Sequence, residues 1–175
     1  RKNFNGRTNK DVIEHIFQRP MTEEESMKYA LEKEALYREI YAPHIKPVDG
    51  LLSLLETLDQ LSIPMAIATS GIQVNIDFMF DHLPVKQYFK AVLNSSHIQK
   101  GKPDPEIYLK TAAALHVSPE QCLVFEDATV GVISAKKAGM NVIAITTTQT
   151  KEELAAADFI ITDYHPGSFS SLQLT

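Results

Sequence analysis

The pattern of apolar positions divides the chain into two parts. Residues 1–45 carry apolar side chains at helical spacing and give no strand signal, so they predict a helical segment. Thr22 followed by Glu25 forms a capping box, which predicts that a helix begins there. Pro43 and Pro47 bracket the next few residues. Because proline disfavours helical geometry in the residue before it, this stretch is predicted to be a hinge.

From residue 46 onward, helical and strand patterns alternate. Short continuous apolar runs, typical of strands buried on both faces, occur at residues 65–68, 91–93, 122–125, 142–145 and 159–161. Helical patterns separate them, with one helix predicted to end at Gly139 and a short one to begin at Thr150. This alternation predicts an α/β fold in which helices cover both faces of a parallel sheet. We therefore expect two domains, 1–45 and 46–175.

Charge and composition exclude several classes of partner. The 17 Lys and Arg residues against 22 Asp and Glu give a net charge of −5, so the basic excess needed for nucleic-acid binding is absent. No apolar run approaches the ~20 residues that span a bilayer, and no signal-peptide segment follows Arg1. The single cysteine, Cys122, fits a reducing compartment. We expect a monomeric cytoplasmic protein with no membrane or nucleic-acid partner.

Polar groups directly follow three of the predicted strands or lie in the loops between them. Ligands of open parallel sheets bind at the carboxyl ends of the strands, so these groups are expected to meet on one rim. They comprise a hydroxyl-rich turn, a lysine in a proline-bracketed loop and a pair of adjacent acids. The candidate residues are Thr69, Ser70, Gly71, Lys102, Glu126 and Asp127.

Each candidate has a functional and a structural interpretation. Adjacent carboxylates such as Glu126 and Asp127 suit Mg²⁺ with a phosphate, yet Asp127 would also suit a plain helix cap. Lys102 could neutralise a phosphoryl group or lie solvated on the surface. Thr69 and Ser70 could bind an anion at a helix start or merely cap that helix. The residues alone leave these alternatives open.

The motifs of several other chemistries are absent from the chain. The sequence contains no G-x-x-x-x-G-K-[ST] or G-x-G-x-x-G loop, no H-E-x-x-H or Cys/His metal spacing, and no G-x-S-x-G. Common nucleotide-binding loops, zinc chemistry and serine hydrolysis are therefore poor fits.

Taken in order, the motifs resemble those of the haloacid dehalogenase-like (HAD) superfamily, in the branch that contains β-phosphoglucomutase and small sugar-phosphate phosphatases. The segments Ala-Thr69-Ser70-Gly71, Gly-Lys102-Pro-Asp-Pro-Glu-Ile-Tyr108 and Val-Phe-Glu126-Asp127-Ala-Thr-Val-Gly131 resemble its second, third and fourth motifs. Asn5-Gly6-Arg7-Thr8 and Glu32-Lys33-Glu34 resemble its helical cap.

The resemblance implies a three-layer, Rossmann-like core at 46–175 and a small helical cap at 1–45. It also implies an Mg²⁺-dependent phosphatase that acts on a small phosphorylated metabolite, expected to be a sugar phosphate, through an aspartyl-phosphate. Thr69 and Lys102 would be catalytic, and Asp127 and Glu126 would hold the metal. The implied substrate- and phosphate-binding residues are Thr69, Ser70, Gly71, Lys102, Arg7 and Lys33.

One motif of that family is missing from the sequence. The family's first motif, D-x-D, supplies the nucleophilic aspartate, and no D-x-D occurs among the 175 residues. The first strand of the core, which would carry it, is missing as well. We therefore expect the natural protein to be longer and the 175 residues by themselves to be inactive. The alternative, from another functional class, is a non-catalytic binding domain that kept the HAD fold.

A second alternative is β-phosphoglucomutase activity. The resemblance places Asn9 where the mutase has a cap arginine that grips a second phosphate. It places Ile72-Gln73 where the mutase has a Lys-Asn pair. Both differences favour a phosphatase. The dehalogenases of the superfamily fit less well, because they need no metal and lack the adjacent acid pair.

Overall fold

The computed structural model describes the backbone of residues 9–170 and the side chains from residue 13 onward within that range. The chain divides into two compact units, Arg1–Ile45 and Lys46–Thr175. The boundary between them lies inside the segment bracketed by Pro43 and Pro47.

The first unit is helical in its described part. It contains α1 (Asn9–Phe17), α2 (Glu23–Tyr41) and the short η1 (Ala42–His44). The predicted capping box is confirmed, since Thr22 Oγ1 accepts a hydrogen bond from Glu25 N (3.2 Å) and Glu25 Oε2 accepts one from Thr22 N (3.1 Å). The two helices pack against each other, with the rings of Phe17 and Tyr29 4.6 Å apart.

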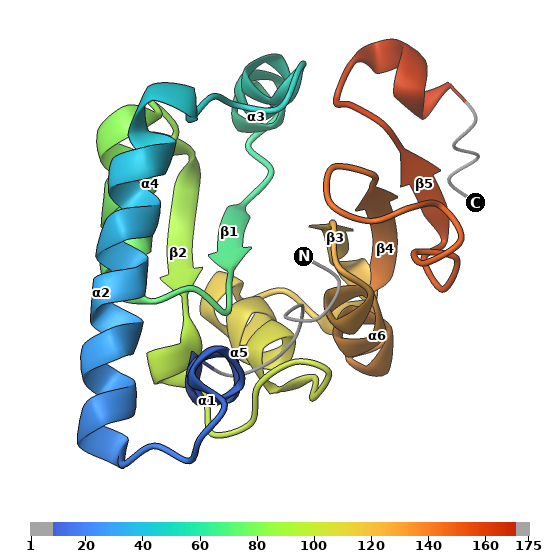
Figure 1. The fold of residues 1–175 in the computed structure, drawn as a ribbon. Helices are drawn as coiled ribbons and strands as arrows, with labels where there is room; N and C mark the ends of the chain where they lie inside the picture. The colour runs from blue at the N-terminus through green and yellow to red at the C-terminus, as the bar shows by residue number, and fades with distance from the viewer. Residues whose placement is uncertain (1–8, 171–175) are drawn as a thin grey trace. The chain divides into compact units, whose positions relative to one another are not determined.

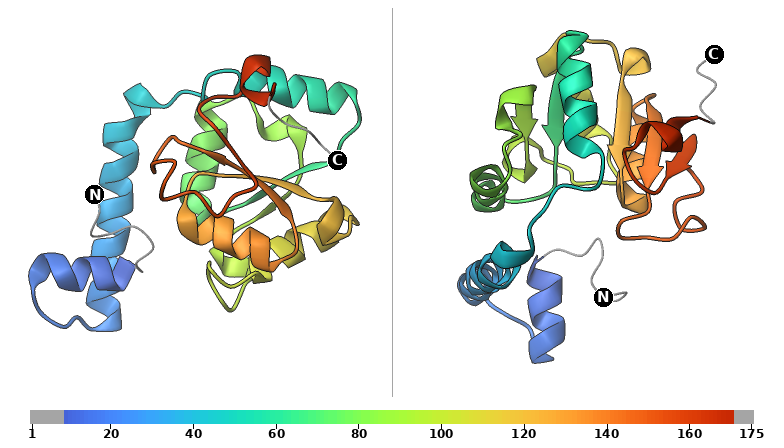
Figure 2. Two further views of the ribbon diagram at one scale, coloured as in Figure 1. Left: turned by 90° about the vertical axis from the view of Figure 1, so that its right-hand side faces the viewer. Right: turned by 90° about the horizontal axis from the view of Figure 1, so that it is seen from above.

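The second unit alternates strands with helices (Figures 1 and 2). Its strands are β1 (Met65–Ala68), β2 (Phe89–Leu93), β3 (Leu123–Glu126), β4 (Asn141–Ile145) and β5 (Phe159–Ile161). Its α-helices are α3 (Leu51–Gln60), α4 (Gln73–His82), α5 (Glu106–Leu115) and α6 (Thr129–Lys137). Short 3₁₀ turns occur at η2 (Lys86–Tyr88), η3 (Ser95–His97), η4 (Pro119–Gln121) and η5 (Pro166–Phe169).

All strand pairs in this unit are parallel, which confirms the predicted α/β class. The strands nevertheless form two sheets, one in the order β1-β2 and the other in the order β3-β4-β5. Within the described residues, β1 pairs only with β2, and β3 pairs only with β4. One edge of β1 and one edge of β3 are therefore left without a strand.

A shared core joins the two sheets. The largest buried cluster combines residues of α5, α6 and β4 with partly buried residues of β1, β2 and β3. In β4, Val142 and Ala144 belong to this cluster, whereas Ile143 and Ile145 are buried in a second cluster on the opposite face. Because successive side chains of a strand point to opposite faces, burial on both faces explains why β4 is a continuous apolar run.

The helix end predicted at Gly139 is confirmed. Gly139 adopts a φ of 80°, and Met140 N donates to the carbonyl of Ala135 (3.1 Å), as in a helix that closes on a left-handed residue.

The helix predicted to begin at Thr150 is wrong, because residues 151–156 form turns. The local capping signal is present, since Thr150 N donates to Glu153 Oε2 (2.9 Å). Leu154 N donates to the carbonyl of Thr150 (3.1 Å), as in one helical turn, but Ala157 N already donates to the carbonyl of Leu154 (3.0 Å) and the next strand begins at Phe159, so the segment is too short for a helix to extend.

Candidate active site

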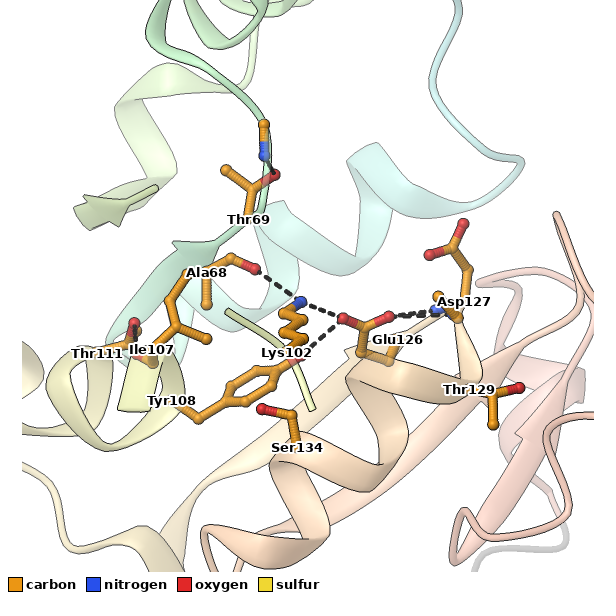
Figure 3. Close-up of polar contacts among 12 residues, drawn as sticks. Ala68, Thr69, Lys102, Ile107, Tyr108, Thr111, Glu126, Asp127, Thr129 and Ser134 are labelled. Atoms are coloured by element: carbon orange, nitrogen blue, oxygen red, sulfur yellow. Dashed lines mark hydrogen bonds and ion pairs between the residues drawn. The ribbon is translucent and has the colours of Figure 1, made fainter. Parts of the chain in front are cut away.

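The predicted rim contains a buried ion pair at its centre. Lys102 Nζ contacts Glu126 Oε1, and the same ammonium group donates to the carbonyl of Ala68 at the end of β1 (3.3 Å) (Figure 3). The two charged side chains are only 10% and 9% exposed. Lys102 therefore connects the ends of β1 and β3, and the alternative of a solvated surface lysine is wrong.

The carboxylate of Glu126 is surrounded by donors. Oε1 accepts from Lys102 and from the hydroxyl of Tyr108 (2.7 Å). Oε2 accepts from the backbone N–H groups of Asp127 (2.9 Å) and Ala128 (3.1 Å). An ionised carboxylate offers about four acceptor positions, so the protein itself occupies the acceptor capacity of Glu126.

The close approach of helix α6 also fixes the position of Glu126. Gly131 lies in the first turn of α6, and a Cβ atom built on it would overlap the Glu126 carboxylate. Only a residue without a side chain leaves room for this carboxylate beneath the helix start.

Burial and neighbouring charges shift the pKa of Glu126 downward and that of Tyr108 upward. Burial alone would raise the pKa of Glu126, but the Lys102 ammonium and the hydrogen bonds hold it below its ordinary value. Burial, followed by the Glu126 charge, raises the pKa of Tyr108 well above its usual range. Glu126 is thus ionised at neutral pH, while Tyr108 keeps its proton to donate.

Tyr108 supports the lysine as well as the acid. The Lys102 ammonium lies 4.8 Å from the centroid of the Tyr108 ring, a cation–π distance. Tyr108 is 4% exposed. Its ring and hydroxyl therefore hold Lys102 and Glu126 in one fixed arrangement.

Two further contacts hold the loop that carries Lys102. Glu106 accepts from the backbone N–H groups of Gln99 (3.0 Å) and Lys100 (2.8 Å). The fully buried Ser134 of α6 donates to the carbonyl of Asp104 (2.6 Å). The lysine loop is thereby tied to the helix that follows Asp127.

Asp127 lies in a different environment from its neighbour. Its side chain points away from the Lys102–Glu126 pair (Figure 3). Oδ2 is within hydrogen-bond distance of the hydroxyls of Thr148 (3.1 Å) and Thr147 (3.4 Å), while Oδ1 receives no hydrogen bond from any described residue. Asp127 thus has acceptor capacity to spare.

The alternatives in which Asp127, Thr69 or Ser70 merely caps a helix are wrong. Helix α6 has Ala128 at its N-cap and helix α4 has Ile72, and neither helix receives a hydrogen bond from its N-cap side chain. Thr69 lies just after β1, where its Oγ1 accepts from Gly71 N (3.0 Å). The neighbouring Ser70 is exposed.

The second unit brings together Lys102, Glu126 and Asp127 with the turn that contains Thr69, Ser70 and Gly71. The two other predicted phosphate-binding residues belong to the first unit. Arg7 is outside the described residues. Lys33 lies on α2 in the first unit, where its ammonium pairs with Glu34 (2.7 Å). Arg7 and Lys33 stay predictions.

Sequence reasoning missed four residues that shape this site, namely Tyr108, Gly131, Ser134 and Thr148. A glycine in the first turn of a predicted helix was a usable signal for Gly131. Thr148 also had one, because its loop follows a predicted strand at the same rim. The hydroxyls of Tyr108 and Ser134 gave no local signal, since their roles depend on contacts between distant segments.

Whether a metal ion fits this site depends on which side-chain oxygens remain free to bind it. Among the described residues no group of three or more His, Cys, Asp or Glu side chains is placed to hold a metal ion. Asp127 offers one free carboxylate oxygen, which suits a hard cation, whereas Glu126 is already surrounded by donors. The residues fit Mg²⁺ through Asp127, with its other ligands supplied from elsewhere.

No helix in the described part of the chain is long and apolar enough to cross a membrane.

Comparison with known proteins finds relatives that are named as phosphatases. A validoxylamine A 7'-phosphate phosphatase of Streptomyces hygroscopicus subsp. limoneus is 37% identical over 121 residues, covering 69% of this chain and 57% of that protein. Hexitol phosphatase A of Escherichia coli is 33% identical over 119 residues, covering 67% and 54%. The chain thus spans little more than half the length of these curated relatives.

Solved structures and a family model agree with these relatives. The crystal structure of a HAD hydrolase of family IA, variant 3, from Entamoeba histolytica is 38% identical and has a TM-score of 0.86, covering 93% of this chain and 76% of that one. The model of the haloacid dehalogenase-like hydrolase family matches residues 1–145. The chain therefore belongs to the haloacid dehalogenase-like hydrolases.

Proposed function

We propose that the protein to which this chain belongs is an Mg²⁺-dependent phosphatase. It would hydrolyse a small phosphorylated metabolite, with sugar phosphates as the expected class. The observation that carries the proposal is the arrangement of Thr69, Lys102 and Asp127 around the ends of β1 and β3. The relatives named as phosphatases support the reaction type. The monomeric state and cytoplasmic location stay predictions.

Lys102 is proposed to bind the phosphoryl group. An ammonium group has three N–H donors, and Lys102 directs two of them to Glu126 and Ala68. The third is available to a phosphoryl oxygen. Because the lysine is nearly buried, its charge acts in a medium that screens it less than water does, which strengthens its effect on developing negative charge.

Thr69 is proposed to donate to another phosphoryl oxygen. Its Oγ1 accepts from Gly71 N through one lone pair, and its hydrogen remains available to donate. The same turn orients the Ser70 and Gly71 backbone near the end of β1. This turn would fix the phosphoryl group relative to Lys102 rather than take part in bond breaking.

Asp127 is proposed to be the metal ligand of the acid pair, and Glu126 the counter-ion that holds Lys102. This division follows from their different acceptor capacities. When bound, Mg²⁺ would offset negative charge on the phosphoryl group. Lys102 and the metal would then balance charge on the phosphoryl oxygens, and Thr69 would donate a hydrogen bond to one of them.

The nucleophile is proposed to be an aspartate outside these 175 residues, which forms an aspartyl-phosphate that water then hydrolyses. The free edges of β1 and β3 support this proposal. A further parallel strand between them would join the two sheets and place its carboxyl end beside Lys102 and Asp127. The 175 residues alone are then expected to be inactive.

The test is an assay of the intact protein, meaning the natural polypeptide to which these residues belong. It is measured against p-nitrophenyl phosphate and a panel of sugar phosphates, with Mg²⁺ and with EDTA. The proposal predicts release of inorganic phosphate that EDTA abolishes. Activity unaffected by EDTA, or no hydrolysis of any phosphate ester, would overturn it.

The same panel separates the alternatives. Conversion of β-glucose 1-phosphate to glucose 6-phosphate without phosphate release would indicate a mutase. The mass of the intact native protein tests the non-catalytic alternative. A mass that matches only these 175 residues would support a binding domain, whereas a larger mass would agree with a nucleophile on a further segment.

A further inference from the structure

A threonine-rich loop after β4 contacts the turn that carries Asp127. The Thr148 hydroxyl lies 2.7 Å from the carbonyl oxygen of Asp127 and 3.1 Å from its Oδ2, and Thr147 lies 3.4 Å from the same Oδ2. Strand β4 pairs in parallel with β3, and Ala144 is the register partner of Glu126. The loop after β4 therefore emerges beside the turn between β3 and α6, and this contact follows from the sheet register.

Gln149 extends the contact to the start of α6. Its Oε1 accepts from both the backbone N–H and the hydroxyl of Thr129, the latter at 2.8 Å. Ala128, at the N-cap, has no side chain able to cap the helix. Gln149, 20 residues further along the chain, supplies an acceptor for the first N–H of α6, so the same loop holds both Asp127 and the helix that follows it.

The position of the hydrogen bonds on Asp127 matters for a ligand. The single hydrogen of the Thr148 hydroxyl is shared between the backbone oxygen of Asp127 (2.7 Å) and its Oδ2 (3.1 Å), Thr147 adds a contact to Oδ2 (3.4 Å), and Oδ1 receives no hydrogen bond from the described residues. A carboxylate held on one oxygen presents the other in a fixed direction. Hydrogen-bond partners of this kind orient metal ligands, and losing one typically weakens metal affinity about 10- to 100-fold.

We infer that Thr148 is a positioning residue, which holds the carboxylate of Asp127 in place for a divalent cation. The inference rests on the proposed function, because it takes Asp127 as the metal ligand. Thr148 acts through Asp127 and touches neither substrate nor the reacting atoms. Gln149 assists by fixing the start of α6 directly after the turn.

A purely structural role for Thr148 makes a different prediction. If its hydroxyl served only to attach the loop, its loss would lower stability and leave metal affinity unchanged. Thr148 is exposed, so water can satisfy Asp127 when the hydroxyl is removed, and little stability is at stake. The positioning role therefore predicts weaker metal binding at nearly constant metal-free stability.

The experiment measures Mg²⁺ binding to the intact protein by calorimetry, together with the melting temperature in EDTA. Thr148→Val removes the hydroxyl at nearly constant shape, and Thr148→Ser restores it. Thr57→Val is the matched control, because Thr57 on α3 donates a comparable exposed hydrogen bond to Ser53 O (2.8 Å), outside the site. All four proteins are measured without substrate.

The inference predicts that Mg²⁺ dissociates from Thr148→Val with a constant about tenfold higher than from wild type. Thr148→Ser and Thr57→Val should bind as wild type does, and all metal-free melting temperatures should agree closely. Wild-type affinity in Thr148→Val would overturn the inference while leaving the proposed function intact. No Mg²⁺ binding by the wild type would overturn both. A lower metal-free melting temperature with unchanged affinity would assign Thr148 a structural role.

Discussion

Glu126 and Asp127 are neighbours in the sequence, but their carboxylates lie in opposite surroundings. Glu126 faces the interior, where Lys102, Tyr108 and two backbone N–H groups donate to it. Asp127 faces the open side of the rim, where threonine hydroxyls contact one of its oxygens. Adjacent acids in one motif can therefore have different roles: one is a fixed counter-ion, and the other remains available to a ligand.

This comparison also separates stability from function. Lys102 and Glu126 form a nearly buried ion pair, so removing one partner leaves an uncompensated buried charge. The hydroxyls around Asp127 come from the exposed residues Thr147 and Thr148, so water can replace a hydrogen bond that is lost there. Substitutions on the inner side should therefore change folding stability strongly, and those on the outer side should change ligand binding while sparing the fold.

The largest expected effect comes from Lys102→Met. Glu126 would remain buried without its counter-ion, and we expect a loss of about 3 kcal/mol in the free energy of unfolding. Denaturant unfolding measures it. Lys136→Met is the matched control, since its ion pair with Asp158 is about one third exposed and should cost about 0–1 kcal/mol. Equal losses in the two variants would refute the contrast between a buried and an exposed pair.

Gly131→Ala tests the inner side through shape rather than charge. Replacing a helical glycine by alanine ordinarily stabilises a protein by about 1 kcal/mol. Here the new Cβ would overlap the Glu126 carboxylate, so we expect destabilisation of about 2 kcal/mol instead. Gly167→Ala, where a Cβ meets open space, is the control in the same unfolding assay. A stabilised Gly131→Ala protein would show that Glu126 lies elsewhere.

Tyr108→Phe should have a smaller effect of the same kind. It removes one buried hydrogen bond to a charged acceptor and leaves the other three donors to Glu126 in place, so we expect a loss of about 1.5 kcal/mol. Thermal and denaturant unfolding both measure it. Tyr88→Phe provides the comparison, because Tyr88 packs in a separate cluster. If the two variants lost equal stability, the hydroxyl of Tyr108 would have no special role.

Much of the core could be predicted from the sequence, and the reason is local. The strand at residues 142–145 is apolar throughout because both of its faces are buried, and a run of that kind is visible without a structure. The capping box at Thr22 and the glycine at 139 are likewise local signals, and both were confirmed. The helix predicted at Thr150 was wrong although its capping contact is present, because the chain turns again at Leu154 and the next strand begins at Phe159.

The sequence predicted where the site residues lie but not which way their side chains point. The rule that ligands bind at strand ends selected Lys102 and Glu126, which are in contact, and the neighbouring Asp127. It gave no information on which acid faces inward, because that depends on the direction of each side chain and on Tyr108, a helix residue 18 positions before Glu126. The contact between Thr148 and Asp127 depends on the pairing of β3 with β4, which no local pattern specifies.

The division of work between the two acids is tested most directly by Asp127→Asn in the intact protein, with the melting temperature measured in EDTA and in Mg²⁺. Asn has nearly the same size, its side-chain oxygen still accepts from Thr148, and Asp127 does not cap α6. The metal-free melting temperature should therefore stay close to wild type. Stabilisation by Mg²⁺, which arises only from binding to the folded state, should be lost. An Mg²⁺-induced shift as large as that of the wild type would contradict the assignment of Asp127 as the metal ligand.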